Sequence, residues 1–158
     1  LRVLELVYAQ VPQLEAKIIG SGELEAEVRA AWAQSPAREH IQLLGYQPNA
    51  YGLLQEADLM LMTSLWEGTP MCALEAMALG VPIVSTPVDG LKDLVEPGQT
   101  GFLEAEDQAL ADRCAEIIGD PQLRQRLSKN AQEKAEKLLD LDAYRQQLQA
   151  GYELGGSL

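Results

Sequence analysis

Short apolar runs alternate along the chain with longer segments in which apolar residues recur at helical spacing. The apolar runs predict strands over residues 14–19, 39–44, 58–63, 82–86 and 101–103. Helices are predicted over residues 1–10, 23–34, 49–56, 71–79, 91–96, 108–118, 122–139 and 141–154. Alternation of apolar strands with helices is typical of α/β proteins. We therefore expect a parallel, doubly wound, Rossmann-like sheet.

The most informative stretch is residues 64–86, which is predicted to contain the end of a strand, a turn, a short helix and a second buried strand. Thr69 is a residue type that caps helices, and Pro70 suits the first helical position because its missing N–H would have no partner there. Gly80 suits the left-handed position that often ends a helix. These residues predict a helix over 71–79.

Two glutamates flank the start of that helix. Glu75 is the only polar side chain in residues 71–79, and a helix that is apolar all round is normally buried, so we expect Glu75 to be buried and to need a binding partner. Glu67 lies in the preceding turn, at the carboxyl end of a strand, where open α/β sheets bind ligands. The free N–H groups of Met71 and Cys72 favour an anion such as a phosphate. Together these groups match a sugar, its diphosphate and a ribose.

The residues around the two glutamates resemble the signature of a known family. Residues 67–75, EGTPMCALE, followed by AMALGVPIV, are similar to the E-x7-E motif of retaining glycosyltransferases of the group-1 or family-4 type. The resemblance extends from residues 17–22 through 41–45 to 98–102. It implies the C-terminal half of a GT-B fold, which binds the nucleotide-sugar donor of an enzyme that transfers a sugar to an acceptor hydroxyl with retention.

The resemblance also implies roles for individual residues. Glu75 would hold the ribose hydroxyls, while Glu67 would bind the transferred sugar and stabilise positive charge at its anomeric carbon. In this family an Arg and a Lys that contact the diphosphate come from a loop ahead of the first helix, which here would precede Leu1. We expect no cofactor and no metal, the nucleotide sugar being a substrate. Glu67 is therefore the predicted catalytic residue, and the predicted donor-binding residues are Gly68, Thr69, Pro70, Met71, Cys72 and Glu75.

Charge and composition narrow the classes of partner. The net charge of −12 argues against binding to nucleic acid and to an anionic membrane surface. No Lys or Arg occurs between residues 39 and 91, so cations for a diphosphate bound there must come from elsewhere. No apolar run reaches the roughly 18 residues that a membrane span requires. Cys72 and Cys114 have no paired spacing and suit a reducing cytoplasm.

The length predicts one domain over residues 1–158, with C-terminal helices over about 108–154, and the resemblance implies that this domain binds a nucleotide sugar. The chain begins inside the amphipathic segment 1–8 and without Met, so we expect a domain truncated at its N-terminus, from which the acceptor-binding domain is absent. Its expected partners are the nucleotide sugar and that missing domain. Such a fragment is expected to bind a nucleotide weakly and to transfer nothing.

Other interpretations stay open at this point. Glu67 alone is compatible with a surface turn, and Glu75 alone with a buried pair to a backbone group or an Arg. The turn at residues 20–22 either passes close to a ligand or the facing domain or is an ordinary strand-to-helix turn. His40 is expected to face solvent or to have a structural role rather than a catalytic one. The whole chain is also compatible with a non-catalytic nucleotide-sugar-binding module, or with a hydrolase or epimerase on the same fold.

Overall fold

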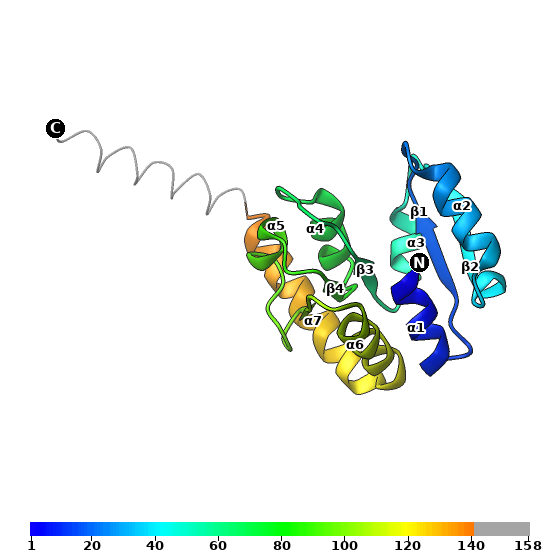
Figure 1. Ribbon diagram of the computed structural model, residues 1–158. Helices are drawn as coiled ribbons and strands as arrows, with labels where there is room; N and C mark the ends of the chain where they lie inside the picture. The colour runs from blue at the N-terminus through cyan, green and yellow to red at the C-terminus, as the bar shows by residue number, and fades with distance from the viewer. Residues whose placement is uncertain (141–158) are drawn as a thin grey trace, which may run out of the picture.

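The computed structural model describes residues 1–140 as a chain in which helices alternate with parallel strands (Figure 1). The N-terminal half contains α1 (Arg2–Gln10), β1 (Ala16–Ile19), α2 (Glu25–Gln34), a 3₁₀ turn (Arg38–His40), β2 (Ile41–Gly45) and α3 (Tyr51–Gln55). The C-terminal half contains β3 (Met60–Met62), α4 (Met71–Ala78), β4 (Ile83–Ser85), α5 (Asp89–Lys92), β5 (Gly101–Leu103), α6 (Asp107–Gly119) and α7 (Pro121–Leu138).

The strands form two sheets. β1 pairs with β2, and β3, β4 and β5 pair in that order, with every pairing parallel. In the second sheet Met60 lies opposite Ile83, and Ile83 in turn lies opposite Gly101. The predicted α/β class and parallel strand direction are thus confirmed, but the described strands do not form one continuous sheet.

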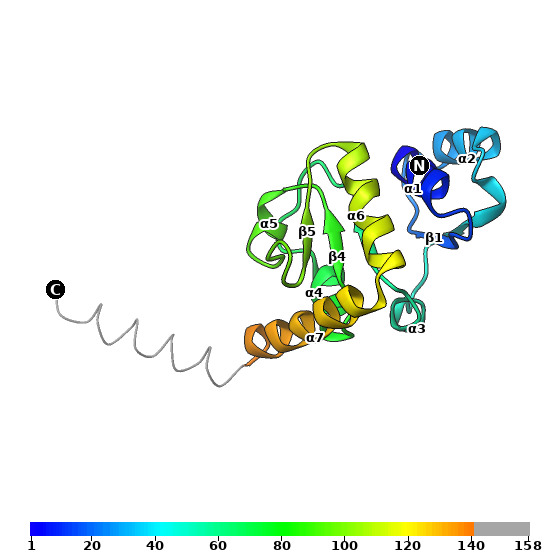
Figure 2. The same ribbon diagram turned by 90° about the horizontal axis from the view of Figure 1, so that it is seen from below.

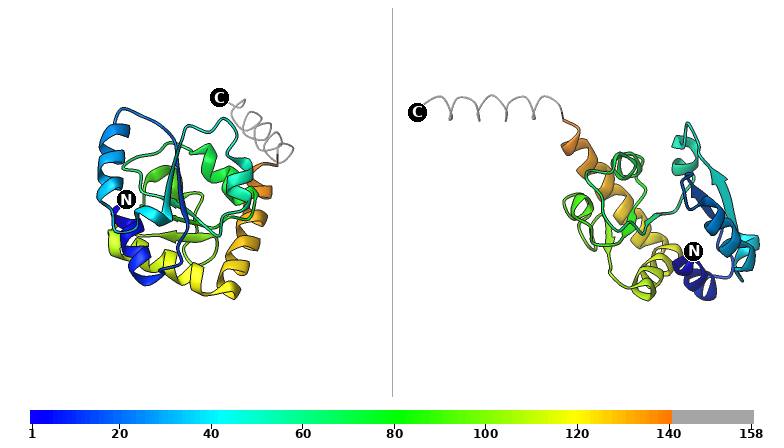
Figure 3. Two further views of the ribbon diagram at one scale, coloured as in Figure 1. Left: turned by 90° about the vertical axis from the view of Figure 1, so that its right-hand side faces the viewer. Right: turned by 45° about the horizontal axis from the view of Figure 1, so that its top comes forward.

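One apolar core nevertheless joins the two halves. Val3 and Val7 of α1 pack in the same cluster as Val84 of β4 and Leu110 and Ile117 of α6. Helix α1 lies along α6, as Figure 3 shows, and α7 lies against α4 on the other side of the second sheet (Figure 2). A second cluster is formed by Met62, Ala73, Met77, Ile83, Leu91, Leu94, Val95, Ala131 and Ala135.

Helix boundaries follow local signals in the sequence. Gly80 has a φ of 74°, and the N–H groups of Gly80 and Val81 donate to the carbonyls of Met77 and Ala76, which is the hydrogen-bond pattern of a Schellman motif. At the start of α7 the Asp120 carboxylate accepts hydrogen bonds from the next free N–H groups, and Pro121 follows it directly. The prediction that Gly80 ends the central helix is therefore confirmed.

Two predicted elements differ from the structure, and a third cannot be compared with it. The strand predicted over 39–44 begins only at Ile41, because Arg38–His40 form a 3₁₀ turn. The ring of His40 contacts that of Tyr8, and its Nδ1 lies 2.9 Å from the carbonyl oxygen of Leu14, so its role is structural, as expected. The helix predicted over 91–96 is instead α5, which begins at Asp89. The helix predicted over 141–154 lies outside the described residues.

Among residues 1–140, none of the helices combines the length and the apolar character that a membrane crossing demands.

Candidate functional site

Helix α4 presents one face to solvent and buries the other. Ala73, Ala76 and Met77 are fully buried, whereas Met71, Cys72 and Glu75 are exposed along with Ala78. These exposed positions follow the spacing i, i+1, i+4, i+7, which lies on one side of a helix. The prediction that Glu75 is buried is therefore wrong. Its carboxylate projects from an exposed face of the helix that also carries Met71 and Cys72.

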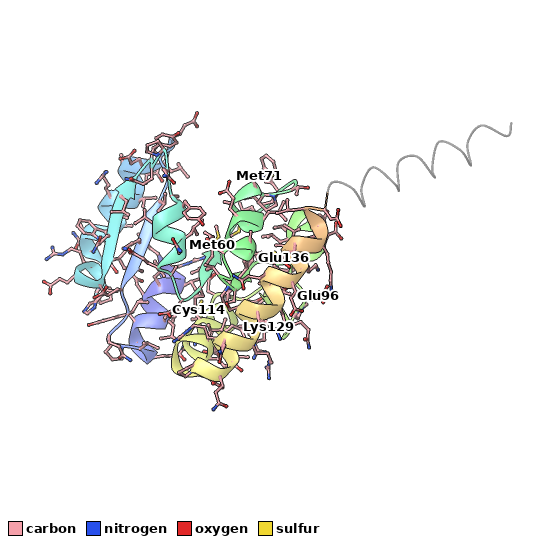
Figure 4. The ribbon with its side chains drawn as sticks, turned by 180° about the vertical axis from the view of Figure 1, so that it is seen from behind. Met60, Met71, Glu96, Cys114, Lys129 and Glu136 are labelled. Atoms are coloured by element: carbon pink, nitrogen blue, oxygen red, sulfur yellow. The ribbon has the colours of Figure 1, made fainter. Side chains whose placement is uncertain are left out.

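Helix α4 begins at Met71, but its N-cap lies one residue later than predicted. Pro70 is the N-cap residue, with extended backbone at φ −73° and ψ 110°, and its carbonyl accepts the N–H of Ala73 at 3.0 Å. Thr69 is exposed and no side chain caps the helix, so the predicted cap is wrong. Within residues 1–140 the N–H of Met71 has no acceptor. The positive end of the helix dipole is consequently open to a ligand (Figure 4 labels Met71).

Glu67 lies in the turn between β3 and α4 and is less exposed than Glu75. Its Oε1 accepts a hydrogen bond of 2.8 Å from the Ser64 hydroxyl. The hydroxyl of Thr86, directly after β4, donates to the carbonyl of Ser64 at 2.6 Å, and the N–H of Gly90 donates to the carbonyl of Glu67 at 3.3 Å. The turn that carries the predicted catalytic carboxylate is thus held by three separate hydrogen bonds.

Gly90, at the start of α5, is packed directly against this turn. A Cβ atom at position 90 would overlap the carbonyl oxygen of Gly68, so only glycine fits without moving the backbone of one of the two segments. The neighbouring Asp89 points to solvent and pairs with Lys92 at 2.8 Å, whose hydrogen bond lowers the pKa of that carboxyl. Asp89 was not predicted as a site residue, and the structure gives no reason to add it.

The pKa of the Cys72 thiol depends on both glutamates. The pKa of its thiol is raised, first by partial enclosure of the sulfur, although the residue as a whole is exposed, and then by the negative charges of Glu67 and Glu75. Both carboxylates therefore act electrostatically on one sulfur in the first turn of α4. The two glutamates that the sequence placed at this helix start are brought to the same region.

Three residues that hold the turn were not predicted from the sequence: Ser64, Thr86 and Gly90. Ser64 precedes Glu67 by three positions, a separation at which a hydroxyl readily reaches a carboxylate within a turn, so a local signal existed. Thr86 and Gly90 reach the turn from the next strand–helix unit, and nothing in their local sequence indicates that contact.

The turn at residues 20–22 borders a pocket of about 270 Å³ at the carboxyl ends of β1 and β2. Its walls are mainly apolar and include Ile18, Val28 and Leu43, with the ion pair between Arg29 and Glu25 among its polar groups. Within residues 1–140 no group of three or more His, Cys, Asp or Glu side chains is arranged to hold a metal ion.

Comparison with known proteins places the chain in a family. Residues 1–134 match the family model described as "Glycosyl transferases group 1". The chain is 36% identical over 119 residues to a putative colanic acid biosynthesis glycosyltransferase WcaL of Salmonella typhimurium, covering 69% of this chain and 29% of that protein. It is 38% identical over 107 residues to the amylovoran biosynthesis glycosyltransferase AmsK of Erwinia amylovora, covering 61% of this chain and 26% of that protein.

A solved structure extends the likeness to three dimensions. Anabaena Alr3699/HepE, crystallised in complex with UDP-glucose, is 30% identical and superposes with a TM-score of 0.81 over 99% of this chain and 44% of that one. The chain therefore spans less than half the length of each of these three proteins.

Proposed function

The chain belongs to the group 1 glycosyl transferases, and from that premise we propose that it is the donor-binding part of a retaining glycosyltransferase that uses a nucleotide sugar. The single observation that carries the proposal is the placement of Glu67 and Glu75 about the uncapped start of α4, where both charges act on the thiol of Cys72. An anion-binding helix start with a carboxylate on each side can bind a nucleotide sugar. One carboxylate would bind the sugar, the helix start the diphosphate, and the other carboxylate the ribose.

In this proposal Glu75 binds the ribose. Its carboxylate is exposed and carried on a helix, so it can accept hydrogen bonds from two neighbouring hydroxyls of a ring laid against the open face of α4. The exposed side chains of Met71 and Cys72 line the same face and would be covered by the bound nucleotide. The complex of HepE with UDP-glucose supports a uridine nucleotide as the first ligand to test.

The start of α4 binds the diphosphate. The free N–H of Met71 and the helix dipole favour negative charge there, and Pro70 keeps the approach free of a capping side chain. The absence of Lys and Arg from residues 39–91 means that this segment supplies no cation to the diphosphate. The resemblance implies that an Arg and a Lys ahead of α1 supply the rest of the compensating charge.

Glu67 acts on the transferred sugar. One of its carboxylate oxygens accepts from Ser64, which leaves Oε2 to accept from a sugar hydroxyl and to face the positive charge that develops at the anomeric carbon. The three hydrogen bonds on the turn fix this carboxylate before the ligand arrives, so little reorganisation is needed at the moment of transfer.

The acceptor is bound by a separate domain in this proposal, so the 158-residue chain binds the donor without transferring its sugar. Calorimetric titration with UDP, GDP and ADP and their glucose conjugates tests donor binding, and release of free nucleotide from the conjugates tests turnover. Binding of one nucleotide series without nucleotide release is expected. Turnover by the chain alone, or lack of binding to every nucleotide, would overturn the proposal.

A further inference from the structure

The turn that precedes α4 carries two large apolar side chains that face solvent. Leu65 is 93% exposed and Trp66 is 83% exposed, and they follow each other directly in the sequence. Single exposed apolar residues are ordinary on protein surfaces, but an adjacent leucine and tryptophan form an apolar patch of the kind that binds a partner or a ligand.

The backbone that presents this pair is held in place at both ends. The two residues lie inside the short loop that the hydrogen bond from the Ser64 hydroxyl to Glu67 closes. The hydroxyl of Thr86 donates to the carbonyl of Ser64 at 2.6 Å, and the N–H of Gly90 donates to the carbonyl of Glu67 at 3.3 Å. Because the turn is already fixed, little backbone entropy is lost when a ligand covers the patch.

The two tryptophans of the chain have different surroundings. Trp32 is partly buried, and its indole N–H donates to the carbonyl of Ile41 at 2.8 Å. Among residues 1–140 the indole N–H of Trp66 meets no acceptor, and its ring contacts no other aromatic ring. Trp66 therefore offers an apolar ring face together with a free donor at the edge of the ring, which suits a ligand that is partly apolar and partly polar.

The charges near the turn favour a neutral ligand that carries hydroxyls. Glu67 follows Trp66 directly and has one free carboxylate oxygen, and Asp89 begins the short helix that packs against this turn. Residues 39–91 contain no Lys or Arg, and the ammonium of Lys92 is paired with Asp89 at 2.8 Å. Carboxylates accept hydrogen bonds from hydroxyls and repel anions. An acidic ligand and an anionic lipid surface are thus disfavoured at this turn.

A pyranose ring has the chemistry that matches this patch. Its faces carry C–H groups that pack against an aromatic ring, and its edge carries hydroxyls that pair with an indole N–H and with a carboxylate. Consecutive Cα atoms are about 3.8 Å apart, so a pyranose stacked on Trp66 lies beside a sugar held by Glu67. An acceptor saccharide would occupy this position relative to the transferred sugar.

We propose that Trp66, together with Leu65, is a binding platform for a neutral saccharide acceptor. One face of a pyranose stacks on the indole, and the indole N–H donates to a hydroxyl oxygen at the edge of the pyranose. Leu65 extends the apolar surface beneath the saccharide. The inference deepens the proposed function, on which it rests for the direction of transfer, because it names a carbohydrate as the acceptor that the separate domain also holds.

Nuclear magnetic resonance of the 158-residue chain tests the platform, with methyl β-D-glucopyranoside as the probe. The two indole N–H signals are followed during the titration, and Trp66→Phe identifies the signal of Trp66. That signal is expected to move and to reach a plateau at millimolar probe. The Trp32 signal should stay in place, because its N–H is already bonded to Ile41. A Trp66 signal that does not move would overturn the proposal.

Substitutions separate the ring face from the rest of the turn. Saturation transfer from the protein to the C–H protons of the probe measures binding without an indole signal. Trp66→Ala should weaken binding at least about tenfold, whereas Trp66→Phe should retain most of it because it keeps an aromatic face. Leu24→Ala is the matched control, since Leu24 is also apolar and exposed but lies directly ahead of α2. Equal binding by all three variants would overturn the proposal.

Two further probes test the chemistry of the occupant. Methyl β-D-glucuronide has the same ring with an added carboxylate, so it should bind about threefold or more weakly than the glucoside. Vesicles of phosphatidylcholine and phosphatidylglycerol should leave the tryptophan emission unchanged. Tighter binding of the glucuronide would overturn the assignment of a neutral ligand. A vesicle-induced blue shift that Trp66→Phe abolishes would assign the patch to a membrane surface instead.

Titration of the same samples with UDP and UDP-glucose distinguishes failure of the platform from failure of the donor site. Binding of UDP without a response to the glucoside would overturn the platform alone, whereas a response to the glucoside without binding of any nucleotide would overturn the donor site alone. With UDP-glucose bound, the glucoside should still move the Trp66 signal. Loss of that movement would show that the glucoside takes the place of the transferred sugar, and would overturn its assignment as an acceptor.

Discussion

The hydroxyl of Ser64 donates a hydrogen bond of 2.8 Å to Oε1 of Glu67 across the turn between β3 and α4. This bond gives the two oxygens of the carboxylate different environments, one held by the protein and the other free. Because Thr86 and Gly90 hold the backbone of the same turn, the free oxygen has a defined direction. Glu67 is therefore oriented in advance for a ligand at the start of α4.

Ser64→Ala should weaken recognition of the sugar more than recognition of the nucleotide. The substitution removes the hydrogen bond that orients Glu67 but leaves Glu75 and the start of α4 unchanged, so UDP-glucose affinity is expected to fall about fivefold and UDP affinity to stay the same. Calorimetric titration with the two ligands measures this difference. Ser128→Ala, on α7, is the matched control. Equal losses for both ligands would contradict the assigned role of Ser64.

Gly90→Ala should disturb the turn without touching a ligand. The added methyl group would overlap the carbonyl oxygen of Gly68, so we expect a loss of about 1–3 kcal/mol in the free energy of unfolding, together with weaker UDP-glucose binding. Urea denaturation measures the first effect. Gly119→Ala is the control, since a Cβ there meets nothing within 4 Å. Similar free energies of unfolding for the two variants would show that the turn moves to accommodate the added methyl group at little cost in stability.

The thiol of Cys72 provides a direct probe of both glutamates. Their charges contribute to its raised pKa, so Glu67→Gln and Glu75→Gln should each lower that pKa and shift alkylation by iodoacetamide to lower pH, with the larger shift for Glu67→Gln. Glu136→Gln, on α7, should have no effect. Burial raises the pKa of Cys114 to about 12, so its signal stays separate when the modified peptides are identified by mass spectrometry. An unchanged profile for either variant would place that glutamate away from the helix start.

The sequence predicts the elements well where short-range physics decides them. Apolar runs located the strands, Gly80 located the end of α4, and the motif brought Glu67 and Glu75 to one helix start. The exposure of Glu75 could not be predicted from residue types, because whether Met71 and Cys72 are buried depends on what packs against them. The contacts of Thr86 and Gly90 with the turn arise from the next strand–helix unit and have no local signal.

The division of the strands into two sheets could not be predicted from the sequence either. The strand pattern predicts parallel strands, but strand order depends on which edges meet in the folded chain. Met60 and Leu61 have the composition of an interior strand, so the pattern alone favours one continuous sheet. In the structure β3 instead has one edge that no described strand covers.

Calorimetric titration of the 158-residue chain with UDP tests the central claim most directly, when the chain is compared with its Glu75→Gln and Glu136→Gln variants. Both glutamates are exposed, so both variants should keep the fold. If Glu75 binds the ribose, the unaltered chain and Glu136→Gln should bind UDP equally, and Glu75→Gln should bind at least about tenfold more weakly. Equal affinity in all three chains would contradict the assignment of the nucleotide to the open face of α4.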